Sequence, residues 1–396
     1  MTLLELQDYD ISADKGFLCD YNADLITLSG ALATARKIAM ALPSILPSGR
    51  VRQYLKDNLP GHANEQEWQK EISPLDDHQA RMLMVHYSFM VQAYVWGEDE
   101  APEILPEKLA VPMCCLAERL GQQPLLPYSG YVLDNWAKLN NDGDVDLDNI
   151  YMIQNFLGGQ DENWFVLIHV AIEARAGECL ALMKPIVEAI ENNDADSVTD
   201  CLNKMAPVWG DIIDIFKRMP ERCDPYVYFE RVRPYIHGWR DNPALPNGII
   251  YEGVDKYAGK PQTFRGQTGS QSSIVPTMDA LLGIGHAADP LKTFLDQLHI
   301  YRPPSHRRFI DDVRQASTLR EFVKSSGNAA MIDGYNHLVK AVSDFRTQHL
   351  LYAANYINKQ KRGAAGNDTE VGTGGTPFMK YLKKHRDETS NNLLPY

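Results

Sequence analysis

The stretch Asn328–Lys361, NAAMIDGYNHLVKAVSDFRTQHLLYAANYINKQK, decides the fold class. Its large apolar and aromatic side chains recur in alternating steps of four and three, the spacing of one buried face of an α-helix. The positions on this face are Met331, Tyr335, Leu338, Val342, Phe345, His349, Tyr352 and Tyr356. We therefore predict a long core-facing helix with one histidine, His349, inside its apolar stripe.

His349 has two interpretations in this stripe. An imidazole in apolar surroundings needs a hydrogen-bond partner or a metal, because unpaired ring nitrogens cost on the order of a few kcal/mol there. A haem iron would supply that partner. An ordinary core histidine with a local hydrogen bond fits the same spacing and is commoner, so the spacing alone favours the second interpretation.

A second histidine, His169, interrupts the stretch Trp164–Ile172, WFVLIHVAI. This stretch is apolar on all sides and predicts a buried helix. Glu173, one turn further on, could orient the His169 ring. Histidines on two helices fit the two sides of a haem plane, a bis-histidine metal site, or two separate core positions with local partners. The residues alone leave these alternatives open, and the last is the simplest.

The rest of the chain shows the same helical character. Apolar residues recur at helical spacing in Leu25–Leu42 and in Arg81–Val95, whereas strand-like alternation is scarce. Breaks bearing Pro and Gly lie between the helical segments, at 43–49, 124–127, 243–248, 253–273 and 302–305. Because 396 residues exceed what one core usually serves, we predict an all-α protein of two domains, or of one domain with a large appendage.

The composition disfavours several classes of protein. The net charge of −13, without clustered Lys and Arg, argues against a nucleic-acid partner. No uncharged apolar run is long enough to cross a bilayer, so no membrane partner is expected. The first residues, MTLLE, resemble neither a signal nor a transit peptide, which predicts a cytoplasmic protein. The motifs H-E-x-x-H, G-x-S-x-G and a strand-to-helix G-x-G-x-x-G do not occur, which disfavours zinc hydrolases, α/β-hydrolases and Rossmann enzymes.

Three segments are candidates for contact with a ligand. Long loops in compact domains often serve binding, so 253–273 is a candidate wall of a site, although a surface excursion is slightly favoured. The glycines of 372–376, GTGGT, suit a mobile lid and a passive linker equally. The segment 226–233, YVYFERVR, combines aromatic and guanidinium groups suited to an aromatic ligand with a carboxylate, or forms an ordinary solvated face.

Several motifs, in order and over most of the chain after Tyr128, resemble the indoleamine 2,3-dioxygenase family. They are Leu133–Trp136 (LDNW), Gly238–Trp239 before Asn242–Pro243, Tyr251–Gly253 (YEG), Gly269–Ser273 (GSQSS), Tyr301–Arg307 (YRPPSHR), Arg346–Leu350 (RTQHL) and Gly372–Thr376 (GTGGT). The part before Tyr128 matches more weakly.

The resemblance implies the fold and the reaction. It implies a small helical domain, 1–155, and a larger helical domain, 156–396, that encloses haem b. In this family, O₂ and an indole substrate meet at the haem, and the C2–C3 bond of L-tryptophan is opened to give N-formylkynurenine. A reductant keeps the iron ferrous.

The resemblance also assigns site residues. It makes His349 the proximal iron ligand, with Arg346 near the haem, and it makes Arg233 the partner of the substrate carboxylate. Thr373 matches the threonine that bonds the amino-acid group of the substrate, and Gly266 to Ser270, including Gly269, match a loop beside haem and substrate. Further positions match the substrate pocket: Tyr128, Tyr131, Val132, Phe165, Val166, Tyr228 and Phe229, with Phe165 also near the cofactor.

Two departures from the family pattern affect the expected chemistry. His169 stands where animal members carry serine and where the related tryptophan 2,3-dioxygenases carry a distal histidine. Tyr228 stands where the family has phenylalanine. The alternatives to a tryptophan dioxygenase are therefore an oxygenase that modifies another indole or aromatic amine without ring cleavage, a non-catalytic haem-binding protein, and a helical interaction module.

Overall fold

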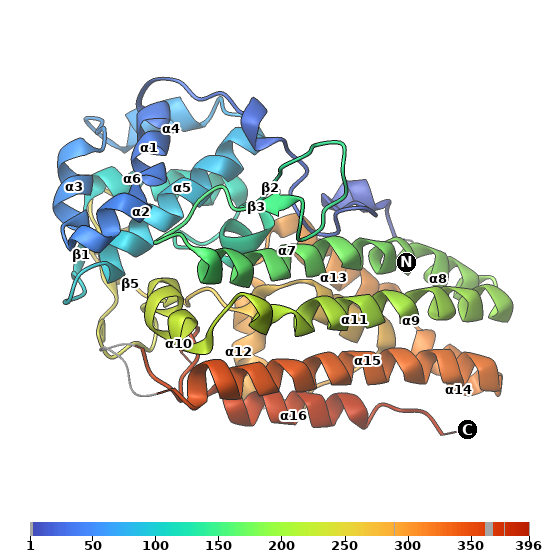
Figure 1. Ribbon diagram of the computed structural model, residues 1–396. Coiled ribbons are helices and arrows are strands. Elements are labelled where there is room, and N and C mark those ends of the chain that lie inside the picture. Colours follow the sequence, from blue (N-terminus) through green and yellow to red (C-terminus); the bar gives the residue numbers. More distant parts are fainter. Residues whose placement is uncertain (1–2, 289, 361–366, 376, 396) are drawn as a thin grey trace.

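The computed structural model describes residues 3–288, 290–360, 367–375 and 377–395, and its architecture is all-α (Figure 1). The first part of the chain forms helices and helical turns, most of which gather at one end of the molecule, drawn blue to teal, while the first turn, Leu6–Tyr9, packs on the helix Pro304–Ala316 of the second part. These elements are η1 Leu6–Tyr9, η2 Ala23–Leu25, α1 Gly30–Met40, α2 Leu42–Ile45, η3 Leu46–Ser48, α3 Val51–Asn58, α4 Glu65–Ile72, α5 Asp77–Trp96, α6 Glu107–Leu120 and η4 Ser129–Leu133. The break expected at 43–49 is therefore wrong in part, because α2 and η3 occupy it.

The second part of the chain forms the longer helices that carry the site. They are α7 Gln160–Ala181, α8 Met183–Glu191, α9 Ala195–Lys217, α10 Pro225–Val227, α11 Ile274–Leu282, α12 Pro290–His299, α13 Pro304–Ala316, α14 Leu319–Ser326, α15 Ala329–Ala353 and α16 Phe378–Ser390. Shorter helical turns connect them: η5 Met219–Glu221, η6 Tyr228–Val232, η7 Arg233–Ile236, η8 Asp255–Tyr257, η9 Gly269–Gln271 and η10 Ala354–Asn358. In Figure 1, α7, α9, α15 and α16 lie side by side in that order, and each packs on the next.

The long helix predicted around His349 is confirmed as α15, and η10 extends it by a π-helical turn to Asn358. The helix predicted around His169 is confirmed as α7. Most residues of α7 are buried, because helices pack on several of its sides. Both helices pack on α9, so they bring the two histidines into the same group of packed helices.

Strands are short in the described part of the chain. They are β1 Ile104–Leu105, β2 Ala137–Lys138, β3 Ile150–Tyr151, β4 Ile249–Tyr251 and β5 Pro261–Gln262. The parallel pair β1–β4 sets Ile104 opposite Ile250, and the antiparallel pairs are β4–β5 and β2–β3. These short strands hold loop segments against the helices.

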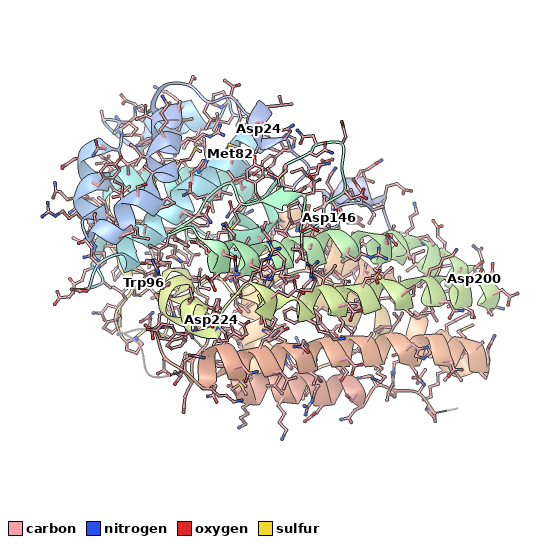
Figure 2. The ribbon with its side chains drawn as sticks, in the orientation of Figure 1. Asp24, Met82, Trp96, Asp146, Asp200 and Asp224 are labelled. Atoms are coloured by element: carbon pink, nitrogen blue, oxygen red, sulfur yellow. The ribbon has the colours of Figure 1, made fainter. Side chains whose placement is uncertain are left out.

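Contacts join the helices before residue 155 to those after it. Trp96, labelled in Figure 2, lies at the end of α5. Its Nε1 donates to the His237 carbonyl at 2.9 Å, and Gln92 donates to the same oxygen at 3.1 Å. One hydrophobic core includes residues from both parts, and a smaller cluster contains Ala23, Met82 and Ala137 of β2. A domain boundary at about 155 stays a prediction; it would fall between β3 and α7.

The six cysteines are buried and carry free thiols. Among the described helices, none combines the length and the apolar character that a bilayer crossing requires.

Candidate functional site

Two adjoining cavities share His349 and the loop around η9. The smaller, of about 160 Å³, lies between α7, α9, α15 and α16, and the larger, of about 760 Å³, lies between α11, α12, α13, α15 and α16. His349 lines both, as do His385 and Leu382 of α16. The walls of the smaller cavity are mainly aromatic and apolar. They include Phe165, Phe216, Met219, Tyr228, Ile236, Phe294, Tyr352, Tyr356, Phe378 and Tyr381.

His349 presents a neutral imidazole to this space. Burial, and then the charges of His169 and Arg346, lower its pKa to about 4, so the ring carries no proton charge at neutral pH. Among the described residues, its ring nitrogens have no hydrogen-bond partner. The local partner that an ordinary core histidine requires is therefore missing, and the nitrogen lone pair is free to bind a metal.

His169 lines the smaller cavity from α7. Its Nδ1 lies 2.7 Å from the Phe165 carbonyl oxygen one turn earlier. A carbonyl only accepts, so Nδ1 carries the proton and Nε2 keeps a lone pair. Burial outweighs this bond and lowers the pKa of His169, which keeps the ring neutral. Its ring centroid and that of His349 each lie 6.4 Å from the Phe216 ring, so both histidines border the same aromatic side chain.

The expectation that Glu173 orients His169 is wrong. Glu173 accepts hydrogen bonds from Tyr128 Oη at 2.9 Å and from Ser272 Oγ at 2.7 Å. Burial raises the pKa of this carboxyl to about 7. Glu173 therefore joins the segment before η4 to the segment after η9, and the Phe165 carbonyl orients His169.

Phe165 and Tyr228 form part of the aromatic wall, with ring centroids 4.6 Å apart. Tyr228 also meets Tyr356 of η10 at 5.8 Å. Both η6 and η10 are π-helical turns, which are frequent at functional sites. Tyr228, one of the departures from the family pattern, thus lines the smaller cavity, and its role there stays a prediction.

Arg346 lines the larger cavity one turn before His349. Its guanidinium is held by Asp279 of α11, with N–O distances of 3.1 and 2.6 Å, and it also donates to Thr389 of α16. Burial raises the pKa of Asp279, but the charge of Arg346 and the hydrogen bond with His286 outweigh it and bring the pKa to about 2. An ionised Asp279 therefore fixes Arg346 beside the cavity.

The last part of the loop 253–273 lines the site, so the surface excursion that composition slightly favoured is wrong for this part. Gln267, Thr268, Gly269 and Ser270 line the smaller cavity together with Thr373. Thr373 Oγ1 donates to the Gln267 carbonyl at 2.5 Å, so the glycine-rich segment is attached to this loop. Residues 363–366 and 376 lie outside the described residues, so no lid motion is assigned to this segment.

Arg233 is buried beside the cavity and does not line it. Its guanidinium donates to Asn367 Oδ1 and, at 2.6 Å, to the Val371 carbonyl, and it lies 5.5 Å over the Phe229 ring. Its Nε has no hydrogen-bond partner in the described part of the chain. Burial lowers its pKa to about 10, which leaves it charged at neutral pH.

Other expected pocket residues form a layer behind the lining. The Tyr131 ring lies 6.4 Å from Phe165, and the Tyr128 ring lies 6.4 Å from His169. Neither these two nor Val132, Val166, Phe229 and Gly266 line the two cavities. Their roles, like those of the lining residues, stay predictions.

The sequence reasoning missed Phe216 and His385. Phe216 follows Ile212 by four residues on α9, so helical spacing could have indicated its buried face. His385 precedes Glu388 by three residues on α16, a spacing that places both on one face. Neither segment belonged to the motifs that resemble the family.

The site can hold a flat metal macrocycle. The walls are mainly aromatic and apolar, a neutral unpaired imidazole offers one ligand for the metal, and His169 offers a second polar group in the same cavity. These are the properties that a haem site needs.

Comparison with known proteins gives a consistent result. The family model described as indoleamine 2,3-dioxygenase matches residues 5–392. The chain is 32% identical to indoleamine 2,3-dioxygenase 1 of Rattus norvegicus, over 99% of this chain and 96% of the relative. It is 30% identical to indoleamine 2,3-dioxygenase 2 of Homo sapiens over the same shares, and 29% identical to indoleamine 2,3-dioxygenase of Saccharomyces cerevisiae over 97% and 92%.

Proposed function

The chain belongs to the indoleamine 2,3-dioxygenase family, and we propose that, as a haem-dependent dioxygenase, it opens the indole C2–C3 bond of L-tryptophan with O₂ to give N-formylkynurenine. The observation that carries the proposal is the neutral, unpaired imidazole of His349 on the wall of an aromatic cavity that also contains His169. The iron protoporphyrin of haem b suits this cavity.

His349 would hold the iron, and the aromatic side chains of the smaller cavity would contact the porphyrin or the indole. When bound, haem supplies the activation of O₂, chemistry that amino-acid side chains do not provide. The wall of the larger cavity includes Arg302, Arg314 and Arg346, which would pair with the haem carboxylates. A cellular reductant and a cytoplasmic location stay predictions from the sequence.

The chain's own residues would position the substrate. The lone pair on His169 Nε2 can accept a hydrogen bond from the indole N–H, because the Phe165 carbonyl fixes the tautomer. Arg233 would pair with the substrate carboxylate after exchanging its bond to Asn367 or Val371 for one to the ligand. Thr373, on the cavity wall, would bond the amino-acid group. Positioning of this kind is the main contribution a protein makes when a cofactor carries the reaction.

The mass of the product tests this function. Haem-loaded protein is incubated with L-tryptophan, O₂ and a reductant, and we expect a product that contains both oxygen atoms of one O₂. Incorporation of one oxygen atom, or a product with an intact indole ring, would instead identify an oxygenase of another indole or aromatic amine. Full haem occupancy without consumption of any indole would refute catalysis.

A further inference from the structure

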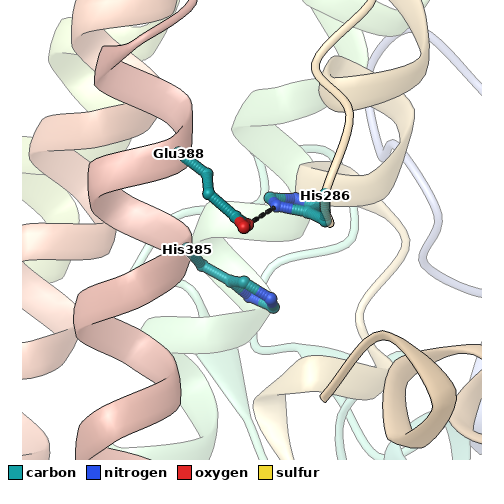
Figure 3. Close-up of side chains that lie close together, drawn as sticks. All are labelled: His286, His385 and Glu388. Carbon is teal, nitrogen blue, oxygen red and sulfur yellow. Dashed lines mark hydrogen bonds and ion pairs between the residues drawn. The ribbon is translucent and has the colours of Figure 1, made fainter. Parts of the chain in front are cut away.

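His286, His385 and Glu388 lie together (Figure 3), and the two histidines line the larger cavity. His286 lies between α11 and α12, while His385 and Glu388 lie one turn apart on α16. One potential ligand atom from each side chain lies within 4.8 Å of the other two. Two segments about a hundred residues apart in the sequence thus supply two imidazoles and a carboxylate to one point.

His286 lies between two carboxylates, one at each of its ring nitrogens. Its Nε2 lies 3.3 Å from Asp279 Oδ2, and its Nδ1 lies 2.6 Å from Glu388 Oε2. Carboxylates only accept, so a neutral ring can donate to one of them and not to both. With the proton on Nε2 toward the ionised Asp279, the Nδ1 lone pair faces an oxygen lone pair. A cation between Nδ1 and Glu388, either a proton or a metal ion, resolves this contact.

His385 supplies an independent observation. Its side chain is 8% exposed, and Nε2 has no hydrogen-bond partner among the described residues. Its ring centroid lies 4.3 Å from that of His286. Burial, and then the charges of His286 and Arg346, lower its pKa to about 3, so the ring is neutral and able to act as a ligand. A buried unpaired nitrogen is costly, and a metal ion would supply the missing partner.

We propose that His286, His385 and Glu388 bind a divalent first-row transition-metal ion, with ligands other than the His349 that is proposed to hold the haem iron. Two imidazole nitrogens and one carboxylate oxygen form a donor set that suits Zn²⁺ and its neighbours and leaves positions open for water. Asp279 orients His286 by accepting a hydrogen bond from its Nε2. A carboxylate in this place is the usual outer partner of a metal-bound histidine. Lys384 Nζ, at 3.3 Å, and the Ala287 amide, at 3.4 Å, hold Glu388 Oε1 and leave Oε2 for the ion.

Zinc binding to the haem-loaded protein tests the proposal. Zn²⁺ is titrated by calorimetry, and the zinc retained after dialysis is measured by elemental analysis. We expect one Zn²⁺ per chain, and we expect H286Q and H385Q each to weaken binding by about tenfold or more. Circular dichroism and haem content establish that each variant is folded, and E388Q provides a third test on the opposite side of the ion.

His62 provides the matched control. It also lies between two carboxylates, 2.5 Å from Glu71 and 3.7 Å from Glu67, but that group contains one histidine where the proposed site has two. H62Q should leave zinc binding unchanged. Absence of zinc binding in the wild type would show that a proton occupies the place between His286 and Glu388 and would overturn the proposal. Binding that is unchanged in H286Q and H385Q, or that occurs only in haem-free protein, would overturn it as well.

Discussion

Gly238 and Gly266 pack backbone against backbone: a Cβ atom added at Gly266 would lie 2.2 Å from the Gly238 amide nitrogen, and one added at Gly238 would lie 2.1 Å from that of Gly266. The added atom at Gly266 would also lie 2.5 Å from the Thr373 carbonyl oxygen. This contact holds the loop 253–273 close to the segment that follows η7. It explains how the loop forms a fixed wall of the site.

Gly266→Ala should destabilise the protein by about 2 kcal/mol or more, because the nearest atoms are backbone and cannot move aside cheaply. Gly269→Ala is the matched control in the same loop. A Cβ there meets no atom within 4 Å, so the change should stay within about 0.5 kcal/mol. Urea unfolding of both variants and the wild type, in the same haem state, measures this. Equal losses would show that the loop is loosely packed.

His169→Ala should weaken binding of L-tryptophan by about tenfold, the equivalent of one hydrogen bond. The benzofuran analogue of tryptophan, with oxygen in place of the indole N–H, has no proton to donate to Nε2. Its affinity should therefore be similar in the wild type and in His169→Ala. Affinities follow from the change in the haem absorption spectrum on titration. If the variant loses equal affinity for both ligands, His169 does not accept from the indole N–H.

Arg233→Ala should raise KM for L-tryptophan by about tenfold to a hundredfold, because a charge-assisted hydrogen bond to the carboxylate is lost. Tryptamine lacks the carboxylate, so its KM should change little. This comparison separates carboxylate binding from the structural bonds of Arg233 to Asn367 and Val371, whose loss would affect both substrates. An unaltered KM for L-tryptophan would contradict the assignment.

His86 should make stability depend on pH. It is buried on α5, it bonds Gln154 Oε1 through Nδ1 at 2.9 Å, and burial lowers its pKa from 6.5 to about 4. The unfolded chain therefore binds a proton more readily than the folded one. The stability linked to His86 is complete above pH 6.5 and falls as the pH drops toward 4.

His86→Asn keeps a donor toward Gln154 and removes the titrating ring. Between pH 7 and pH 5 the wild type should lose about 2 kcal/mol more stability than this variant. Urea unfolding at the two pH values measures the difference. Parallel losses in both proteins would assign the pH dependence to other groups.

The sequence predicted those helices whose buried residues recur at helical spacing. The stripes around His349 and His169 placed α15 and α7 because their buried faces recur at helical spacing. The π-helical turn that begins at Ala354 could not be predicted, because it does not change the spacing of the buried residues. The strands could not be predicted either, because two or three residues are too few to show alternation.

Contacts between distant segments could not be predicted from periodicity. The guanidinium of Arg233 meets Asn367, 134 residues away, so its position behind the cavity wall depends on how the chain returns. Glu173 could be placed one turn from His169, but its partners Tyr128 and Ser272 come from other segments. The resemblance to a family supplied the roles of such residues, and the packing shows what each contacts.

The direct test of the central claim is the absorption spectrum of the haem-reconstituted protein before and after His349→Ala. The wild type should bind one haem per chain with the spectrum of an imidazole-ligated iron. His349→Ala should lose haem or the imidazole signature, and added imidazole should restore that signature. His337→Ala, which removes an exposed histidine from the same helix, should match the wild type. A His349→Ala variant with undiminished haem and the same axial-ligand spectrum would contradict the account.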